Sequence, residues 1–574
     1  MGDGSVSALI SGLAAGSAAA KAVKSAFRQA RWYARYSSIW DFFSRGERTS
    51  TFFYYSSLGK AAAAVPNALT RTLKRSGVYI YRKLENTLFY WLLSWLSERY
   101  DVFFLLFAAA HALVPFALYR NPYTVAVMIF MSFCACARVA LSRGQSTVFS
   151  LKRTDPVFLL YFLSIAASAV YSMFGAGSGA ASLTTSTLYL TAILFAFLIA
   201  NTFFDHRRLL ILIRVVTGAA VFVALYGIYQ YIQGIPIDVT QTDRTTGGAS
   251  LAMGRADSTL GNPNVLAAWL LLVIPFSVSL AFFAKNWLRK LFMASLSLVL
   301  VACILLTQSR SGWVGLFVAG VVFVFFLDWR LIPICAVAGV LSMPFWPNFI
   351  MDRLLISGTD TSTVYRMSIY AGSLRMATSN WATGIGIGLE YFKRYINNYV
   401  YFAYETAPVH SHNLYLQIWL ESGIVAMLAF VWMLLRLIKK GASYIFAQKR
   451  LNSTVRARLS GRGGGVAGVG MASRGSASAG REGSAASADS AGRAGSAAVA
   501  GAADAKGRTG QTGGAAYETR LILIACISAV LGFLAMGFFE YVWFFPRCMN
   551  HFFMIIGIFF CTVNLSAQNQ QQNA

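Results

Sequence analysis

The sequence predicts an all-α polytopic membrane protein with about 12 transmembrane helices. Of its 574 residues, 57% are hydrophobic and only 12% are charged, whereas soluble globular proteins contain about 25% charged residues. Apolar runs of about 20 residues, the length that an α-helix needs to cross a bilayer, recur from position 101 to the C-terminus. The placement of lysine and arginine beside these runs is the third observation, and it orients the predicted helices.

Twelve apolar runs are long enough to be membrane-spanning helices. In chain order they cover residues 102–118, 121–141, 156–174, 183–203, 209–231, 263–284, 290–306, 311–328, 330–346, 413–438, 520–540 and 542–564. The connection between the ninth and tenth spans, residues 347–412, is much longer than the other outer loops. Connections of this length that are not disordered are usually functional, so the loop is expected to be partly helical and to carry the site.

The remaining sequence divides the chain into four regions. Residues 1–100 mix basic residues with aromatic clusters, which is typical of helices at a membrane interface, and residues 101–440 form the transmembrane core. Residues 441–519 form a cytoplasmic loop whose segment 461–514 is almost wholly Gly, Ala, Ser and Arg, and this segment is predicted to be disordered because it cannot bury a core. Residues 520–574 hold the last two spans and a cytoplasmic tail.

The net charge of +27 follows the predicted topology. With the N-terminal region in the cytoplasm, 39 of the 49 lysines and arginines fall on the cytoplasmic side, as the positive-inside rule requires. Both termini are then cytoplasmic and the loop 347–412 lies outside. The basic excess is therefore an insertion and membrane-lipid signal, and no nucleic-acid partner is expected. The seven cysteines lie in or beside apolar segments and predict no disulfide framework.

On the outer side, two arginines lie close to the starts of helices that run inward. Arg255 precedes Asn262, which can cap the sixth span, and Pro263, which suits its first turn. Ser309 can cap the eighth span and hold Arg310 at the membrane boundary. A capped helix N-terminus beside an arginine favours anions, because the backbone N–H groups and the helix dipole both attract negative charge.

The long outer loop contributes a third arginine. Five residues recur there at helical spacing: Val364, Met367, Tyr370, Ala371 and Leu374. This spacing predicts an amphipathic helix that carries Arg366 and Arg375. The glycine-rich segment 383–388 follows no predicted strand, so we interpret it as a turn and not as a nucleotide-binding loop.

Two of the five histidines, His410 and His412, lie just before the tenth span. A His-x-His pair can bind zinc, but the sequence shows no third ligand at suitable spacing, so no metal is expected. Near a helix N-terminus the dipole disfavours the imidazolium, which leaves the imidazole able to accept a proton at neutral pH. His412 is therefore the candidate general base, with His410, Asn413, Ser309 and Glu421 as candidate supporting residues.

The predicted topology places Arg255, Arg310, Arg366 and His412 on one side of the membrane. Arginine suits phosphate because its charge is permanent and its planar fork donates hydrogen bonds in pairs. An anionic group bound at the membrane surface implies a lipid phosphate or pyrophosphate. The four residues therefore predict a site for a phosphorylated lipid.

At these residues the sequence resembles the O-antigen ligase and O-antigen polymerase superfamily of bacterial membrane glycosyltransferases. The resemblance covers roughly residues 205–440, and its motifs occur in the order of the family. They are Arg255 with Gly261-Asn262-Pro263-Asn264, then Ser309-Arg310-Ser311-Gly312, then Arg366 with Gly384-Ile385-Gly386-Ile387-Gly388, and finally His412-Asn413-Leu414-Tyr415-Leu416 with Glu421 and Gly423.

The resemblance implies an inverting transfer, without metal or cofactor, of a glycan from undecaprenyl pyrophosphate to a lipid or protein acceptor. The reaction would take place on the outer face of the bacterial cytoplasmic membrane. Arg310 and Arg366 would bind the pyrophosphate, with Arg255 as a further contributor, and His412 would act as the base. The N-terminal region and the Gly/Ala/Ser-rich segment depart from the family pattern and leave room for other glycan-assembly proteins to dock.

Two alternatives stay open at this point. A polymerase would use the same kind of donor as a ligase, and we favour the ligase because one loop and one histidine motif dominate the outer face. A 12-helix transporter or flippase would be built from two six-span repeats with binding groups near the bilayer midplane. The longest linkers instead follow spans nine and ten, and the ionisable residues lie at the outer boundary.

Overall fold

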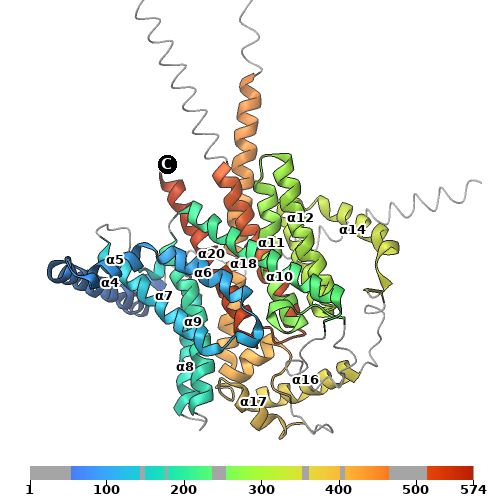
Figure 1. Ribbon diagram of the computed structural model, residues 1–574, viewed down its shortest axis with the longest axis horizontal. Helices are drawn as coiled ribbons and strands as arrows, with labels where there is room; N and C mark the ends of the chain where they lie inside the picture. Colours follow the sequence, from blue (N-terminus) through green and yellow to red (C-terminus); the bar gives the residue numbers. More distant parts are fainter. Residues whose placement is uncertain are drawn as a thin grey trace, which may run out of the picture.

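A computed structural model describes residues 53–142, 149–174, 179–203, 205–235, 254–348, 350–351, 361–400, 408–463 and 514–572. All regular secondary structure in these residues is helical (Figure 1), which confirms the predicted all-α class. Most of the segment that was predicted to be disordered, residues 464–513, lies outside the described part of the chain.

Ten helices in the described residues are long and apolar enough to cross a membrane. They are α7 (Asn121–Leu141), α8 (Pro156–Phe174), most of α9 (Gly179–Thr202), α10 (His206–Gln233), α11 (Pro263–Phe283), α12 (Trp287–Leu306), α13 (Arg310–Asp328), the first part of α18 (Leu414–Gly463), the helix Gly514–Gly537 and α20 (Pro546–Gln572). Each coincides with one of the twelve predicted spans.

The other two predicted spans, the first and the ninth, are shorter helices, so the count of twelve is not confirmed. They correspond to α6 (Tyr100–Leu113) and to α14 (Leu331–Ser342), which continues into the short helix η6 (Met343–Phe345). At 1.5 Å per residue, α6 and α14 are only about 21 and 18 Å long, less than the roughly 30 Å of a bilayer core. Prolines limit both helices, because Pro115 follows the extended residue Val114 and Pro344 is the second residue of η6.

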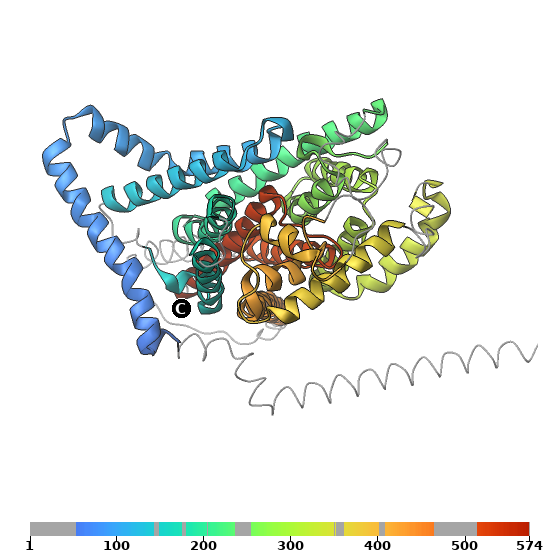
Figure 2. The ribbon, with the colours of Figure 1, turned by 90° about the horizontal axis from the view of Figure 1, so that it is seen from below.

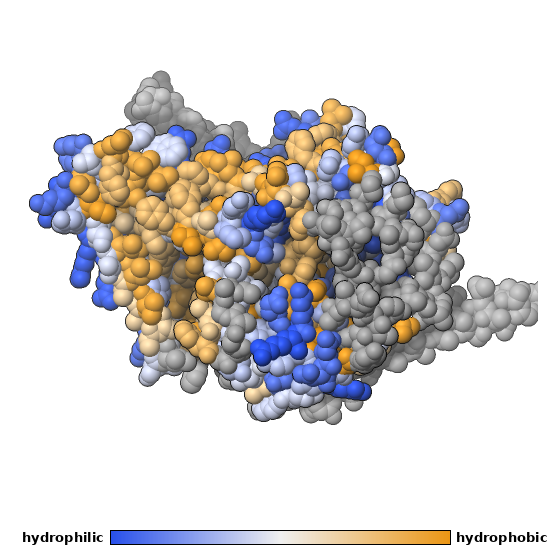
Figure 3. Space-filling model, turned by 60° about the horizontal axis from the view of Figure 1, so that its bottom comes forward, coloured by the Kyte–Doolittle hydropathy of each residue, from blue (hydrophilic) through white to orange (hydrophobic). Residues whose placement is uncertain are grey.

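The centre of the bundle consists of α11, Gly514–Gly537 and α20, whose side chains are largely buried. Only 22% and 28% of the apolar stretches of α12 and α13 are buried, and large apolar side chains such as Ile129 of α7 and Phe317 of α13 face outward. Apolar residues gather over a broad part of one face of the molecule (Figure 3). An apolar exterior around a buried helical centre is what a bilayer environment requires.

Two helices precede the bundle, α4 (Ser57–Leu84) and α5 (Leu88–Glu98). α4 packs against α7 through small residues, and a Cβ on Gly77 would lie 2.1 Å from the Ala140 carbonyl oxygen. Trp91 of α5 is exposed. Figure 2 shows α4, in darker blue, along one edge of the molecule. This arrangement suits the predicted interfacial helices, which stay a prediction.

α18 bends at Gly423, where φ is 76° and ψ is 175°. The bend frees backbone groups of the helix, and the segment between α16 (Thr361–Ser379) and α17 (Leu389–Ile396) pairs with them. Ile385 N donates to the Leu420 carbonyl at 2.7 Å, and Ile424 N donates to the Trp381 carbonyl at 2.9 Å. The glycine-rich segment 383–388 is neither helix nor strand, as predicted, and it docks the outer loop onto the bend of α18.

Replacing Gly423 with alanine is expected to lower the free energy of unfolding by about 2 to 4 kcal/mol, because the new Cβ would be strained twice. The φ of 76° disfavours any L side chain, and the Cβ would lie 2.1 Å from the Ala382 carbonyl oxygen. Thermal unfolding of the purified protein measures the effect. Gly320→Ala in α13 is the matched control, since a Cβ there meets nothing within 4 Å. Equal melting temperatures for the two variants would contradict the packing at the bend.

Candidate active site

The candidate site forms where the N-termini of several helices meet. Three side chains predicted to lie there cap their helices, which fixes the turns that precede them. Asn262 Oδ1 accepts from Asn264 N and Val265 N at the start of α11, and Ser309 Oγ accepts from Gly312 N at the start of α13. Asn413 Oδ1 accepts from Leu416 N at 2.9 Å at the start of α18. Each cap directs backbone N–H groups and the positive end of a helix dipole toward the site.

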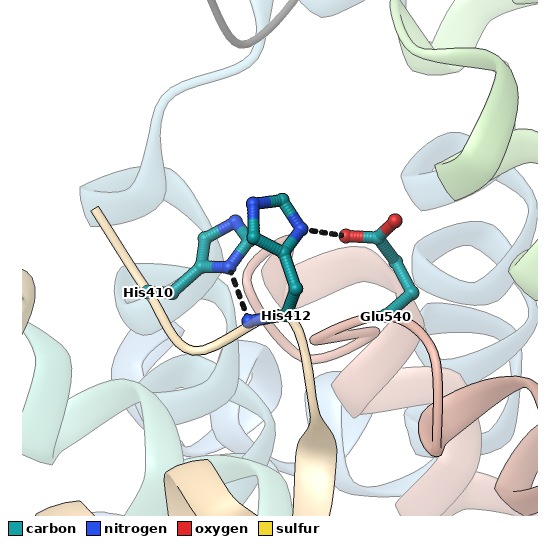
Figure 4. Close-up of side chains that lie close together, drawn as sticks. All are labelled: His410, His412 and Glu540. Carbon is teal, nitrogen blue, oxygen red and sulfur yellow. Dashed lines mark hydrogen bonds and ion pairs between the residues drawn. The ribbon is translucent and has the colours of Figure 1, made fainter. Parts of the chain in front are cut away.

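Glu540 connects the residues of the site. It lies in the turn between the helix Gly514–Gly537 and α20. Its Oε1 is 3.0 Å from His412 Nδ1 (Figure 4), and its Oε2 accepts from Arg366 Nη2 at 3.1 Å and from Asn264 Nδ2 at 3.2 Å. One carboxylate therefore joins α11, α18 and the outer-loop helix α16 (Thr361–Ser379).

The turn that carries Glu540 is held from two sides. Arg366 Nη1 donates to the Phe539 carbonyl at 2.9 Å, and Asn413 Nδ2 donates to the Phe538 carbonyl at 2.9 Å. Arg366 Nε is buried, and no acceptor for it is found within the described part of the chain. The Nε–H group of Arg366 is thus available as a donor to a further anion.

Arg255 joins the same network through Asn264. Its Nη2 is 3.3 Å from Asn264 Oδ1, and its Nε donates to the Thr307 carbonyl at 2.8 Å. Arg310 begins α13, three residues after Thr307, so it lies beside the loop that Arg255 contacts. The structure therefore brings Arg255, Arg366 and His412 to one carboxylate network and places Arg310 at the neighbouring helix start.

The electrostatics of Glu540 fix the protonation of the histidine that faces it. Burial raises the pKa of Glu540, but the charge of Arg366 and the hydrogen bond from His412 hold this pKa well below its usual value. An ionised carboxylate only accepts hydrogen bonds, so Nδ1 of His412 carries a proton and donates it to Glu540. In the neutral ring Nε2 then keeps a lone pair that can accept a proton. The dipole argument from sequence omitted this carboxylate, which stabilises the imidazolium after proton transfer.

Backbone strain gathers at the same turns. Among the described residues only three other than glycine have positive φ, namely Ser258 (52°), Gln308 (51°) and His412 (52°). They precede α11, α13 and α18. Such conformations cost about 1–3 kcal/mol each and persist where surrounding contacts enforce them, often at functional sites. At His412 the backbone N–H donates to His410 Nδ1 at 3.1 Å, and its carbonyl accepts from Tyr370 Oη at 3.2 Å.

Glu540 is not among the residues predicted from the sequence, because the predicted spans 520–540 and 542–564 leave no turn around it. The structure ends the first of these helices at Gly537 and begins α20 at Pro546, so residues 538–545 form a turn. The signal in the sequence that could have identified Glu540 was a carboxylate between two apolar runs, on the side of the predicted topology that has few charges.

The helix predicted around residues 364–374 is confirmed as α16, but the side that it turns to the protein differs from the apolar stripe in the sequence. Val364, Met367 and Leu374 are more than half exposed. The buried side is formed by Ile369, Ser373, Met376 and Ala377. Arg366 lies partly buried between the two sides and reaches Glu540, whereas Arg375 is exposed.

The sequence shows no third ligand at suitable spacing beside His410 and His412, but the structure places Glu540, distant in sequence, next to them. Ligand atoms of the three residues lie within 4.8 Å of one another. Their hydrogen bonds fit a metal poorly. His410 Nδ1 accepts from a backbone N–H, so the neutral ring carries its proton at Nε2. The positive guanidinium of Arg366 already forms an ion pair with Glu540. These contacts suit an acid-base pair anchored by an arginine better than a cation site.

Part of the chain matches a model of a known protein family. Residues 296–431 match the family model described as O-antigen ligase. The resemblance seen in the sequence is thereby confirmed for a segment that contains Arg310, Arg366, His412 and Glu421. Arg255 and Glu540 lie outside the matched segment. A comparison with curated proteins found no match.

Proposed function

From the O-antigen ligase segment and its setting in a bundle of apolar helices, we propose that this chain is a membrane glycosyltransferase of the ligase type. It transfers a glycan from undecaprenyl pyrophosphate to a lipid or protein acceptor on the outer face of the bacterial cytoplasmic membrane. The observation that carries the proposal is the contact of Glu540 with both His412 and Arg366. This contact sets a base beside a group that can bind phosphate.

The donor pyrophosphate binds between the starts of α13 and α18. Arg366 offers its free Nε donor, and Arg310 offers a guanidinium at a capped helix N-terminus. Arg255 supports the site through Asn264. As the leaving pyrophosphate gains negative charge, both arginines stabilise it, and each such interaction typically contributes about 2–4 kcal/mol to lowering the barrier.

The reaction is a direct displacement. The acceptor hydroxyl oxygen attacks the anomeric carbon while its proton moves to Nε2 of His412, and the bond between that carbon and the pyrophosphate oxygen breaks, with its electron pair staying on the pyrophosphate. Glu540 stabilises the resulting imidazolium through Nδ1–H. Attack from the face opposite the leaving group inverts the configuration of the sugar.

The experiment that tests this function deletes the gene in its native host and separates lipid-linked from surface-attached glycans by size. The deletion strain is then complemented with the wild-type gene and with the His412→Ala variant. Full-length glycan that accumulates on undecaprenyl pyrophosphate and is missing from the final acceptor supports a ligase. Single repeat units in place of long chains would identify a polymerase, and an unchanged glycan profile would rule out both and favour a transporter.

Chelation is expected to leave the transferase activity unchanged, because Arg366 and a backbone N–H already occupy groups that a cation would need. Purified protein is incubated with EDTA, passed through a desalting column and assayed, with and without added Zn²⁺ or Mg²⁺. Activity within about twofold of the untreated enzyme is the expected result, since the chemistry then uses only proton transfer and charge stabilisation. A loss that one of these ions restores would make the three residues a metal site.

A further inference from the structure

Glu421 is a buried carboxylate about two turns into α18, below the candidate site. Only 2% of the residue is exposed. Its Oε1 accepts from Gln417 Nε2 at 2.9 Å, and its Oε2 accepts from Tyr189 Oη at 2.8 Å. Each oxygen of Glu421 therefore accepts a hydrogen bond from a side chain that also contacts one of the two turns of the site.

The first connection runs to the turn of His412. Because Glu421 holds the Gln417 amide by its nitrogen, Gln417 Oε1 faces the opposite way and accepts from Ser411 N at 2.9 Å. Ser411 directly precedes His412, whose φ of 52° needs support from its surroundings. Gln417 and Ser411 are completely buried, so no water competes for this hydrogen bond.

The second connection runs to the turn of Glu540. The Tyr189 hydroxyl, on α9, forms a hydrogen bond with the Tyr541 hydroxyl. Tyr541 is 4% exposed and directly follows Glu540. The ring of His410 packs beside Tyr541 with centroids 5.5 Å apart, so the two turns also contact each other here.

We propose that Glu421 is a positioning residue that ties the turn of His412 to the turn of Glu540 and so maintains their 3.0 Å contact. The inference rests on the proposed function, since it assigns Glu421 a role in the same site. Glu421 touches none of the reacting groups and acts through Gln417 on one side and through Tyr189 on the other. A displacement of about 1 Å between catalytic groups can cost about 100-fold in rate. The hydrogen bonds of Glu421 are therefore expected to affect kcat.

The hydrogen-bond directions supply a conservative variant. Glutamine at position 421 can accept from Gln417 with its oxygen and donate to Tyr189 with its nitrogen, provided that Tyr189 turns its own proton toward Tyr541. Glu421→Gln therefore preserves both connections. Glu421→Leu breaks both, Gln417→Leu breaks only the connection to His412, and Tyr189→Phe breaks only the connection to Glu540.

The kinetic test compares these variants in a transfer assay with a defined polyprenyl-pyrophosphate glycan. Glu421→Leu is expected to lower kcat by about 100-fold with the donor KM within about threefold, and Gln417→Leu and Tyr189→Phe by about 10-fold each. Glu421→Gln should retain at least about a fifth of the wild-type kcat. Adding Tyr189→Phe to Glu421→Leu should cause no further loss, because the connection is already broken. Equal kcat for Glu421→Leu and wild type, or multiplicative losses in the double variant, would overturn the proposal.

A second readout does not need the enzyme to be a transferase. Diethyl pyrocarbonate modifies histidines, and peptide mass spectrometry resolves the rate at His412, whose side chain is 4% exposed. Loosening the turn should speed modification several-fold in Glu421→Leu, Gln417→Leu and Tyr189→Phe, and not in Glu421→Gln. His206, paired with Glu518, is the internal control. Unchanged modification rates at His412 in Gln417→Leu and Tyr189→Phe would overturn the inference. If the modification rates changed but neither the wild type nor any variant transferred glycan, the proposed function would be overturned instead.

Discussion

Replacement of His412 by alanine is expected to lower kcat for glycan transfer by about 100-fold or more, with the donor KM within a few-fold of wild type. A positioned general base typically contributes about 10²–10⁴-fold to the rate. The arginines that bind the donor are untouched, so binding should persist while proton removal fails. Steady-state kinetics with a purified lipid-linked donor and a defined acceptor measure both constants.

His206→Ala is the matched control for this prediction. His206 begins α10, and its Nε2 lies 2.9 Å from a Glu518 carboxylate oxygen, so it too is a histidine paired with a carboxylate. It belongs to another part of the chain and should leave kcat unchanged. If His412→Ala retained the wild-type kcat while the arginine variants lost theirs, the base would have to be another group of the site.

Much of the fold could be predicted because the bilayer imposes simple requirements on sequence. Every backbone polar group must be paired inside the membrane, so an apolar run of sufficient length becomes a helix whatever its neighbours are. The first and ninth predicted spans form shorter helices because each contains a proline. Pro115 lies inside the predicted span 102–118, and Pro344 lies inside 330–346, where each limits its helix.

The part of the site that could be predicted is the part that local sequence encodes. Asn262 and Ser309 are recognisable caps, and His412 precedes a long apolar run, so each signal lies within a few residues of the group that it positions. Glu540 is separated from His412 by 128 residues and lies outside the family match at 296–431. Neither periodicity nor resemblance pairs two such residues, because only the packing of α20 and its neighbours brings them together.

α16 shows a second limit of pattern reasoning. The spacing of Val364, Met367 and Leu374 predicted the helix correctly, but these residues face outward. An apolar stripe identifies the protein-facing side only when the surroundings are water. In a chain whose surroundings include lipid, the same stripe can face the membrane, so Arg366 could be placed on a helix but not toward Glu540.

Replacement of Glu540 by glutamine is expected to have the largest single effect, about a thousandfold loss of kcat, because one carboxylate serves several partners. A neutral amide cannot stabilise the imidazolium of His412, and its NH₂ group would face a donor, either His412 Nδ1–H or Arg366. Without the ion pair, the hydrogen bond to the Phe539 carbonyl alone would hold Arg366 less firmly toward the donor site. Kinetics at pH 7 measure the loss, and Glu390→Gln on α17 (Leu389–Ile396), an exposed carboxylate near Lys393, is the control that should retain full activity.

The same variant makes a prediction about stability and pH. Because the folded-state pKa of Glu540 is depressed below its usual value of 4.5, the stabilisation from its ionised form is fully present above that pH and is lost as pH falls toward the folded-state pKa. Wild type and Glu540→Gln should therefore differ in melting temperature by a constant amount between pH 6 and 8, and the difference should shrink below about pH 4.5. A difference that grew on acidification would mean that Glu540 is protonated in the folded protein. In that case Nδ1 of His412 would not need to donate, and the tautomer that leaves Nε2 as the base would lose its support.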